Sequence, residues 1–132
     1  VAITPAAGLV SPAYAIVIGI LGATASFWAV QSKRFFKTDD VLDVFACHGV
    51  AGIVGAILTG AFAFSTGSGK ESMFEQVKIQ MIGVGATIVY AAVGTFVIVK
   101  LIDLVMGIRL AKDDELEGAD IINHEESAYA SK

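Results

Sequence analysis

The chain has 132 residues, of which 55% are hydrophobic and only 17% charged, with a mean hydropathy of +0.73 and a formal net charge of −4. Soluble domains carry about 25% charged residues; here the charges gather between long apolar runs, which excludes a soluble domain and indicates a membrane protein. No basic patch suggests a nucleic-acid partner. The single cysteine, Cys47, excludes an intrachain disulfide and is expected to pack as a small apolar residue on a helix.

The first predicted span covers residues 13–31. Residues 13–30 contain no charge, and about 17–25 apolar residues in a helix cross a bilayer core. Ser11 and Pro12 suit the cap and the first position of this helix. The chain starts at Val1, and no basic region precedes the first apolar stretch, so we expect no signal peptide and interpret the 132 residues as the last part of a longer chain.

The second predicted span covers residues 41–64 and follows a loop with three basic residues. Thr38 or Asp39 is expected to cap this helix, and Asp40 and Asp43 lie where the helix dipole favours negative charge. Asp43 is expected either to cap the helix or to pair with a basic residue at the membrane edge. A turn rich in glycine and serine follows the span.

The third predicted span covers residues 73–109. Its apolar part, residues 79–99, has twenty-one uncharged residues between Lys78 and Lys100. At 1.5 Å per residue the whole helix is about 50 Å long, so we expect it to tilt or to protrude from the bilayer. Lys100 and Asp103 have the spacing of an ion pair within one helix.

Basic residues follow the first and the third span, so the positive-inside bias places the first loop and the C-terminus in the cytoplasm. Small residues also mark both spans, and close packing of small residues holds membrane helices together. We therefore expect partner helices that this chain does not contain. The small residues concerned are Gly19, Gly22, Ala23 and Ser26 in the first span and Gly83, Gly85, Ala86 and Gly94 in the third.

A histidine lies inside the second span. Ionisable residues at bilayer depth are costly and usually face a bundle interior or a transport pathway. Helical spacing places it on a face of otherwise small residues. This predicted stripe consists of Val44, His48, Ala51 or Gly52, Gly55 and Thr59.

Two interpretations of His48 stay open from spacing alone: it lines a transport pathway, or it hydrogen-bonds to a neighbouring helix and specifies packing. A metal role is weak because the other histidine, His124, lies far along a polar tail. Nucleophilic catalysis is weaker still, since no serine or carboxylate is placed to form a relay with His48. We therefore predict no enzyme activity, metal or cofactor.

The motif Asp39-Asp40-x-x-Asp43-x-Phe45-x-x-His48-Gly49-x-x-Gly52-x-x-Gly55 resembles the signature of the ammonium transporter (Amt/Mep) family. Residues 2–8 are similar to an earlier segment of that family, and residues 103–109 and 117–129 are similar to its last helix and regulatory tail. The resemblance covers nearly the whole chain but only about the last third of the family's length. Within the motif, Asp40, Asp43, Gly49, Gly52 and Gly55 would have helix-terminus and structural roles.

The resemblance implies an all-α membrane protein: a homotrimer in the plasma membrane (the inner membrane in a bacterium) whose subunits have eleven transmembrane helices and one pore each. This chain would supply the end of the eighth helix and the last three helices. His48 would be one of two pore histidines, and Val44 would line the same hydrophobic pore. Ammonia would cross beside the histidine pair, which could relay a proton, as a channel or a transporter.

Residues 111–132 form an acidic tail with seven of the thirteen acidic residues of the chain. Composition alone favours a disordered, solubilising end. The resemblance implies instead a cytoplasmic regulatory tail, in which Gly118, Asp120, His124 and Tyr129 match the family pattern and to which PII-type signal proteins could dock. The alternatives to transport are a glycine-rich structural membrane module and a non-transporting ammonium sensor.

Overall fold

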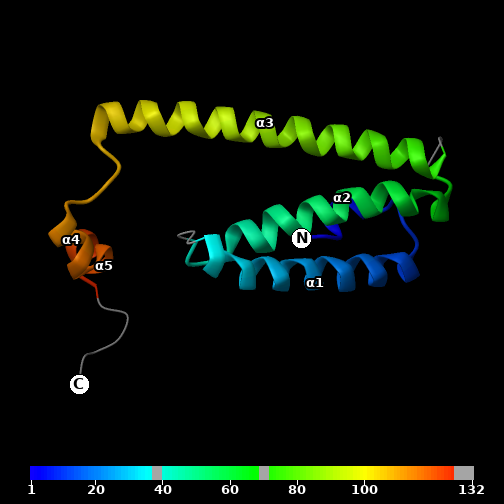
Figure 1. Ribbon diagram of the computed structural model, residues 1–132, viewed down its shortest axis with the longest axis horizontal. Helices are drawn as coiled ribbons and strands as arrows, with labels where there is room; N and C mark the ends of the chain where they lie inside the picture. The colour runs from blue at the N-terminus through cyan, green and yellow to red at the C-terminus, as the bar shows by residue number, and fades with distance from the viewer. Residues whose placement is uncertain (37–39, 69–71, 127–132) are drawn as a thin grey trace, which may run out of the picture. The chain divides into compact units, whose positions relative to one another are not determined.

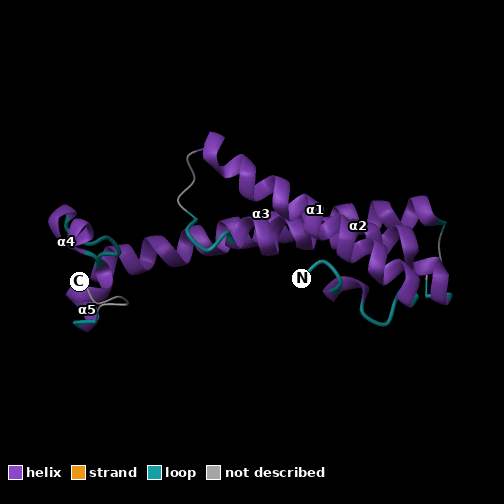
Figure 2. Ribbon diagram, turned by 90° about the horizontal axis from the view of Figure 1, so that it is seen from below, coloured by secondary structure: helices purple, strands orange, loops and turns teal. Residues whose placement is uncertain are grey.

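The computed structural model describes residues 1–36, 40–68 and 72–126, and these residues contain helices and no strand (Figures 1 and 2). The all-helical prediction is therefore confirmed. Thr38, Asp39 and Tyr129 lie outside the described residues.

The chain divides into two compact units, residues 1–89 and 90–132. The elements in chain order are η1 (Thr4–Ala6), α1 (Pro12–Phe36), the π-helix η2 (Phe45–Val50), α2 (Ala51–Phe62), η3 (Ala63–Thr66), α3 (Met73–Met106), α4 (Lys112–Glu117) and α5 (Ala119–His124).

Three stretches are long and apolar enough to cross a membrane: Pro12–Lys33, Phe45–Thr66 and Met73–Met106. Two hydroxyl-bearing residues of the first stretch satisfy their polar groups within the helix, as a lipid environment requires. Thr24 donates to the Ile20 carbonyl and Ser32 to the Trp28 carbonyl, each at 2.8 Å. The prediction of three spans is confirmed, and α1 continues five residues beyond the predicted end at residue 31.

In the first unit, α1 and α2 lie side by side, and the N-terminal segment packs against both (Figures 1 and 2). The core is made mostly of small residues, with Ala2, Ala6, Ile18 and Ala51 buried at its centre. A Cβ on Gly22 would collide with the Ala2 side chain, and a Cβ on Gly55 would lie 2.7 Å from the Ala2 carbonyl carbon. Both glycines therefore let the Ala2 backbone approach, which explains part of the small-residue pattern.

Aromatic and hydroxyl groups close the end of this unit where α1 begins and α2 ends. Tyr14 stacks on Phe62 with 4.6 Å between ring centroids and meets Phe64 edge-on at 5.7 Å. The Ser65 hydroxyl accepts a hydrogen bond from the Ser11 N–H at 2.9 Å. The start of α1 is thereby fixed to the segment after α2.

Helix α3 has 34 residues and none of them is buried within this chain. A Cβ added at Gly83, Gly85 or Gly94 would meet no atom within 4 Å, so the predicted small-residue surface of this helix is unpacked here. The helix ends at Met106, before the predicted residue 109, because Gly107 has a φ of 71°, which glycine adopts without a steric penalty.

The predicted ion pair between Lys100 and Asp103 is wrong for the described residues. The Asp103 carboxylate instead accepts a hydrogen bond from the Ile108 N–H at 3.3 Å, just beyond the end of α3. A short side chain near a helix end competes well for free backbone groups. This contact helps to close the C-terminus of α3.

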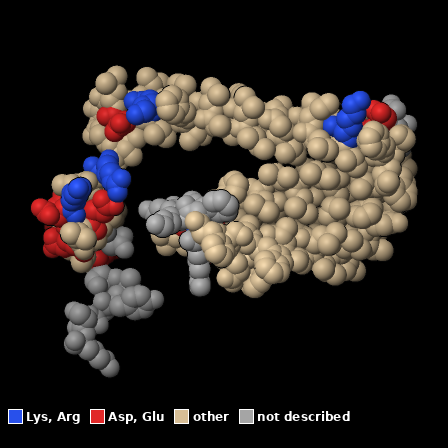
Figure 3. All heavy atoms as spheres, viewed as in Figure 1, with Lys and Arg blue, Asp and Glu red and all other residues tan. Residues whose placement is uncertain are grey.

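The second unit contains the two short helices α4 and α5, joined at Gly118, which has a φ of 108°. Acidic side chains gather over α4, whereas the middle of α3 carries no charge (Figure 3). Arg109 forms an ion pair with Glu115 at 3.0 Å. The disordered tail expected from composition alone is therefore wrong for residues 112–117 and 119–124, which are helical.

Candidate functional site

His48 lies in the π-helix that opens the second membrane stretch. A π-helix closes its hydrogen bonds between residues i and i+5, is rare, and often occurs at functional positions. The sequence prediction assumed a regular α-helix here. The wider turn changes the angular spacing of the residues around His48.

The predicted stripe therefore divides into two parts. Val44 and His48 are exposed, with half of Val44 accessible, whereas Gly55 and Thr59 are buried. The Thr59 hydroxyl is satisfied by the Gly55 carbonyl at 2.7 Å. The prediction of one uniform face is wrong: its later residues pack inside the unit, and its first two lie on a surface that the described chain leaves uncovered.

Asp40 caps the start of this helix. Its two carboxylate oxygens accept hydrogen bonds from the Val44 and Phe45 N–H groups, each at 2.9 Å. These N–H groups lack partners within the helix, so the carboxylate satisfies two of them at once. The same hydrogen bonds, first that from Phe45 and then that from Val44, lower the pKa of the Asp40 carboxyl. Asp40, which was expected near the helix start for its negative charge, thus caps the helix.

Asp43 is the turning point between the loop and the helix. Its φ of 53° is left-handed, a conformation that aspartate tolerates better than most residues. Its carbonyl accepts a hydrogen bond from the Cys47 N–H at 2.9 Å. Its carboxylate forms an ion pair with Lys33 of α1, so the predicted pairing with a basic residue is confirmed.

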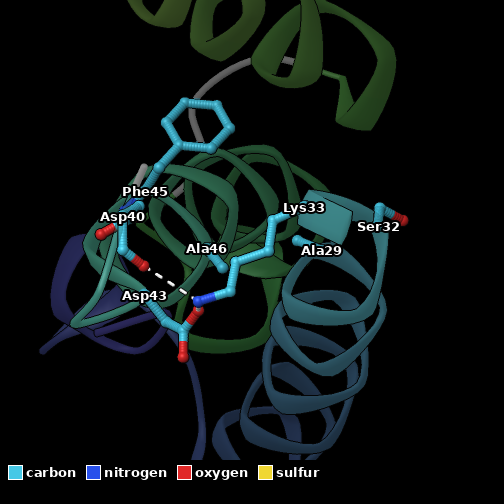
Figure 4. Close-up of a pocket in the computed structure, with 7 residues that line it drawn as sticks. All are labelled: Ala29, Ser32, Lys33, Asp40, Asp43, Phe45 and Ala46. Carbon is cyan, nitrogen blue, oxygen red and sulfur yellow. Dashed lines mark hydrogen bonds and ion pairs between the residues drawn. The ribbon is translucent and has the colours of Figure 1, made fainter. Parts of the chain in front are cut away.

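Lys33 makes a second contact that the sequence did not indicate. Its Nζ donates to the Asp40 carbonyl at 2.9 Å, and Figure 4 shows the lysine reaching from α1 to the loop before the π-helix. Nearer the middle of α1, the Ser26 hydroxyl donates to the Ala46 carbonyl at 3.0 Å. Neither contact could be found from sequence, because each joins α1 to a different segment of the chain, the loop at Asp40 or the π-helix at Ala46.

A cavity of about 490 Å³ lies beside this junction. Its lining combines apolar and charged residues, and His48 is not among them. The lining residues are Ala29, Ser32, Lys33, Asp40, Asp43, Phe45 and Ala46 (Figure 4).

A second cavity of about 260 Å³ is lined in part by Ser26, Cys47 and Ala51. Cys47 is exposed within this chain, so the packing expected for it is not formed among the described residues and stays a prediction. Within residues 1–36, 40–68 and 72–126, no group of three or more His, Cys, Asp or Glu side chains could hold a metal ion. Of the remaining predicted site residues, Gly49 and Gly52 are half-buried, and His124 ends α5.

The Ammonium Transporter Family model matches residues 1–129. The chain belongs to the ammonium transporter family. Its relatives include an ammonium transporter of Bacillus subtilis, 40% identical over 98% of this chain and 34% of the relative. A second, from Aquifex aeolicus, is 45% identical over 98% of this chain and 31% of the relative.

An archaeal relative is ammonium transporter Amt1 of Archaeoglobus fulgidus, which is 34% identical over 97% of this chain and 34% of the relative. No solved structure matches the chain significantly. The chain thus spans about a third of the length of the curated ammonium transporters it matches.

Proposed function

We propose that this chain forms part of an ammonium-conducting pore in which His48 and Val44 line a hydrophobic passage. The observation that carries the proposal is the exposure of His48 within the apolar stretch Phe45–Thr66 of an ammonium transporter family member. An ionisable side chain at membrane depth is costly unless it faces protein or an aqueous pathway. The uncovered surface around His48 therefore faces other helices of the complete transporter and the pore between them.

The chemistry of the histidine fits this role. A neutral imidazole has one nitrogen that donates a hydrogen bond and one that accepts. It can therefore contact ammonia and pass a proton without placing a fixed cation in the passage. Val44, half exposed one turn earlier, supplies apolar wall that disfavours the passage of hydrated ions.

The same proposal covers assembly and orientation. The complete transporter would be a homotrimer in the plasma membrane, with the loop after α1 and the acidic tail in the cytoplasm. Lys33 at the end of the first membrane stretch and Arg109 after the third support that orientation. The tail, including Gly118, Asp120, His124 and Tyr129, would regulate transport and offer a surface to a PII-type signal protein.

A second candidate is a structural module in which His48 only packs against another helix. The tight approach of Ala2 to Gly22 and Gly55 favours it, because small residues at close helix contacts also serve assembly alone. The two candidates predict different consequences when the imidazole is removed.

The experiment replaces His48 with alanine in the complete trimer reconstituted in liposomes. Lys78→Met is the control, since Lys78 is exposed at the start of α3 and has no proposed role in the pore or the tail. The pore proposal predicts that His48→Ala loses or alters ammonium flux while the trimer stays intact, and that Lys78→Met conducts like the wild type. Loss of the trimer without a transport defect in the protein that still assembles would instead support the structural module.

A further inference from the structure

Two side chains on one face of α1 contact the segment that carries His48. Ser26 and Lys33 are seven residues apart, so they lie on the same side of the helix. The Ser26 hydroxyl donates to the Ala46 carbonyl within the π-helix at 3.0 Å. Lys33 forms an ion pair with Asp43 and donates to the Asp40 carbonyl at 2.9 Å. These contacts hold the π-helix at its second residue and at the loop from which it starts.

The contact at Ala46 bears on the shape of the helix. A side chain that bonds to a helix carbonyl from outside competes with the regular hydrogen-bond ladder and accompanies local widening. Ala46 is itself buried, with only 5% of its surface exposed, so its carbonyl needs a partner from protein. The Ser26 hydroxyl provides one at the position where the ladder departs from α-helical spacing.

The contact at Asp43 affects the direction in which the π-helix leaves the loop. Asp43 has a left-handed backbone and its carbonyl accepts a hydrogen bond from Cys47, so rotation at this residue would turn the whole π-helix. Lys33 contacts both the Asp43 carboxylate and the carbonyl of Asp40 in the preceding loop. The lysine and aspartate side chains are about one-third exposed, 32% and 29%. The ion pair is therefore shielded enough to favour one arrangement.

We propose that Lys33, assisted by Ser26, is a positioning residue that sets the register of the π-helix and thereby the direction of the His48 imidazole. The proposal rests on the pore function argued above. Lys33 itself does not contact the transported species. It acts through Asp43, five residues before the histidine.

Cys47 provides a reporter for this register. It directly precedes His48 and its thiol is exposed within this chain, so turning the π-helix changes the access of an alkylating reagent to it in the assembly. The experiment measures the rate of labelling by N-ethylmaleimide, and ammonium flux, in the complete reconstituted assembly. A Cys47→Ala variant gives the background from any cysteine elsewhere.

The test variant is Lys33→Met, which keeps most of the length of the side chain and removes its charge. Lys78→Met is the matched control, because the ion pair of Lys78 among the described residues is with the exposed Glu75, at 3.9 Å. We expect Lys33→Met to change the Cys47 labelling rate by at least about threefold and to reduce ammonium flux about tenfold, the factor that corresponds to loss of one charge-assisted hydrogen bond. Lys33→Arg should restore both, whereas Lys78→Met should change neither.

If Lys33→Met does not assemble, Ser26→Ala provides a second test. This milder variant removes one hydroxyl and no charge. It should shift the labelling rate in the same direction as Lys33→Met, by a smaller factor. Wild-type rates and flux in both variants, or equal changes in Lys78→Met, would overturn the proposal. An assembled wild type that conducts no ammonium would reject the pore function instead, and the labelling rates would still decide whether Lys33 sets the register.

Discussion

Lys33 of α1 forms an ion pair with Asp43, the residue that turns the chain into the helix carrying His48. The contact joins the end of one membrane stretch to the start of the next across the intervening loop. Neither residue lies beside the histidine, yet both determine how its helix begins. The strength of this pair is therefore a measurable property of the candidate site.

A double-mutant cycle measures that strength. Lys33→Met and Asp43→Asn should each lower the free energy of unfolding of the assembly, and the double variant should lose less than the sum of the two. Because both side chains are about one-third exposed, we expect a coupling energy of only about 1 kcal/mol. Thermal melting of the detergent-purified assembly checks the cycle, and strict additivity would contradict the ion pair.

Asp40 should make the stability depend on pH in the acid range. Its pKa is lowered from the ordinary value of 3.8, so its stabilising contribution is complete above that value and is lost as the pH falls through the lower folded-state pKa. Asp40→Asn should therefore melt below the wild type at pH 7, and the gap in Tm should shrink at the acid end of a series from pH 7 to pH 3. A gap that widens on acidification would show that the carboxylate does not cap the helix.

Gly55 should tolerate no side chain. A Cβ there would lie 2.7 Å from the Ala2 carbonyl carbon, so Gly55→Ala must displace backbone and should cost about 1–3 kcal/mol of stability. Gly52→Ala, on the same helix with no neighbour within 4 Å, is the control and should be neutral or stabilise by up to about 1 kcal/mol. Equal Tm values for the two variants would show that Ala2 does not pack against Gly55.

Glu115 should help to order helix α4. Arg109 contacts both carboxylate oxygens of Glu115, but the arginine side chain is 82% exposed, so the pair is weak and screened by salt. Glu115→Gln should speed amide hydrogen exchange in residues 112–117 at low salt and have less effect at high salt. Glu117→Gln is the control, and identical exchange in both variants at low salt would reject the contact.

The sequence predicted the helical class and the three membrane stretches because long uncharged runs report directly on lipid exposure. The ends of these helices depend on contacts that composition does not contain. The second helix begins later than residue 41 because Asp43 adopts a left-handed backbone and Asp40 caps the next turn. The third ends early because Gly107 turns the chain.

The candidate site was predicted only in part. His48 and Val44 were singled out by their position in an apolar run, and their pore role remains a prediction. The division of the stripe after His48 was missed because helical spacing was taken as 3.6 residues per turn, which a π-helix breaks, and because the packing of Ala2 against Gly55 is not visible in sequence. Lys33 and Ser26 were missed as contacts of this helix because no local pattern pairs α1 with the start of the next helix.

The most direct test of the central claim is an ammonium pulse applied to proteoliposomes that contain the complete assembly, with sodium as the control ion. The account predicts a saturable current or flux that is selective for ammonium and is lost or altered in His48→Ala. A correctly assembled trimer that gives no response to ammonium would contradict the account and leave a sensor or structural role.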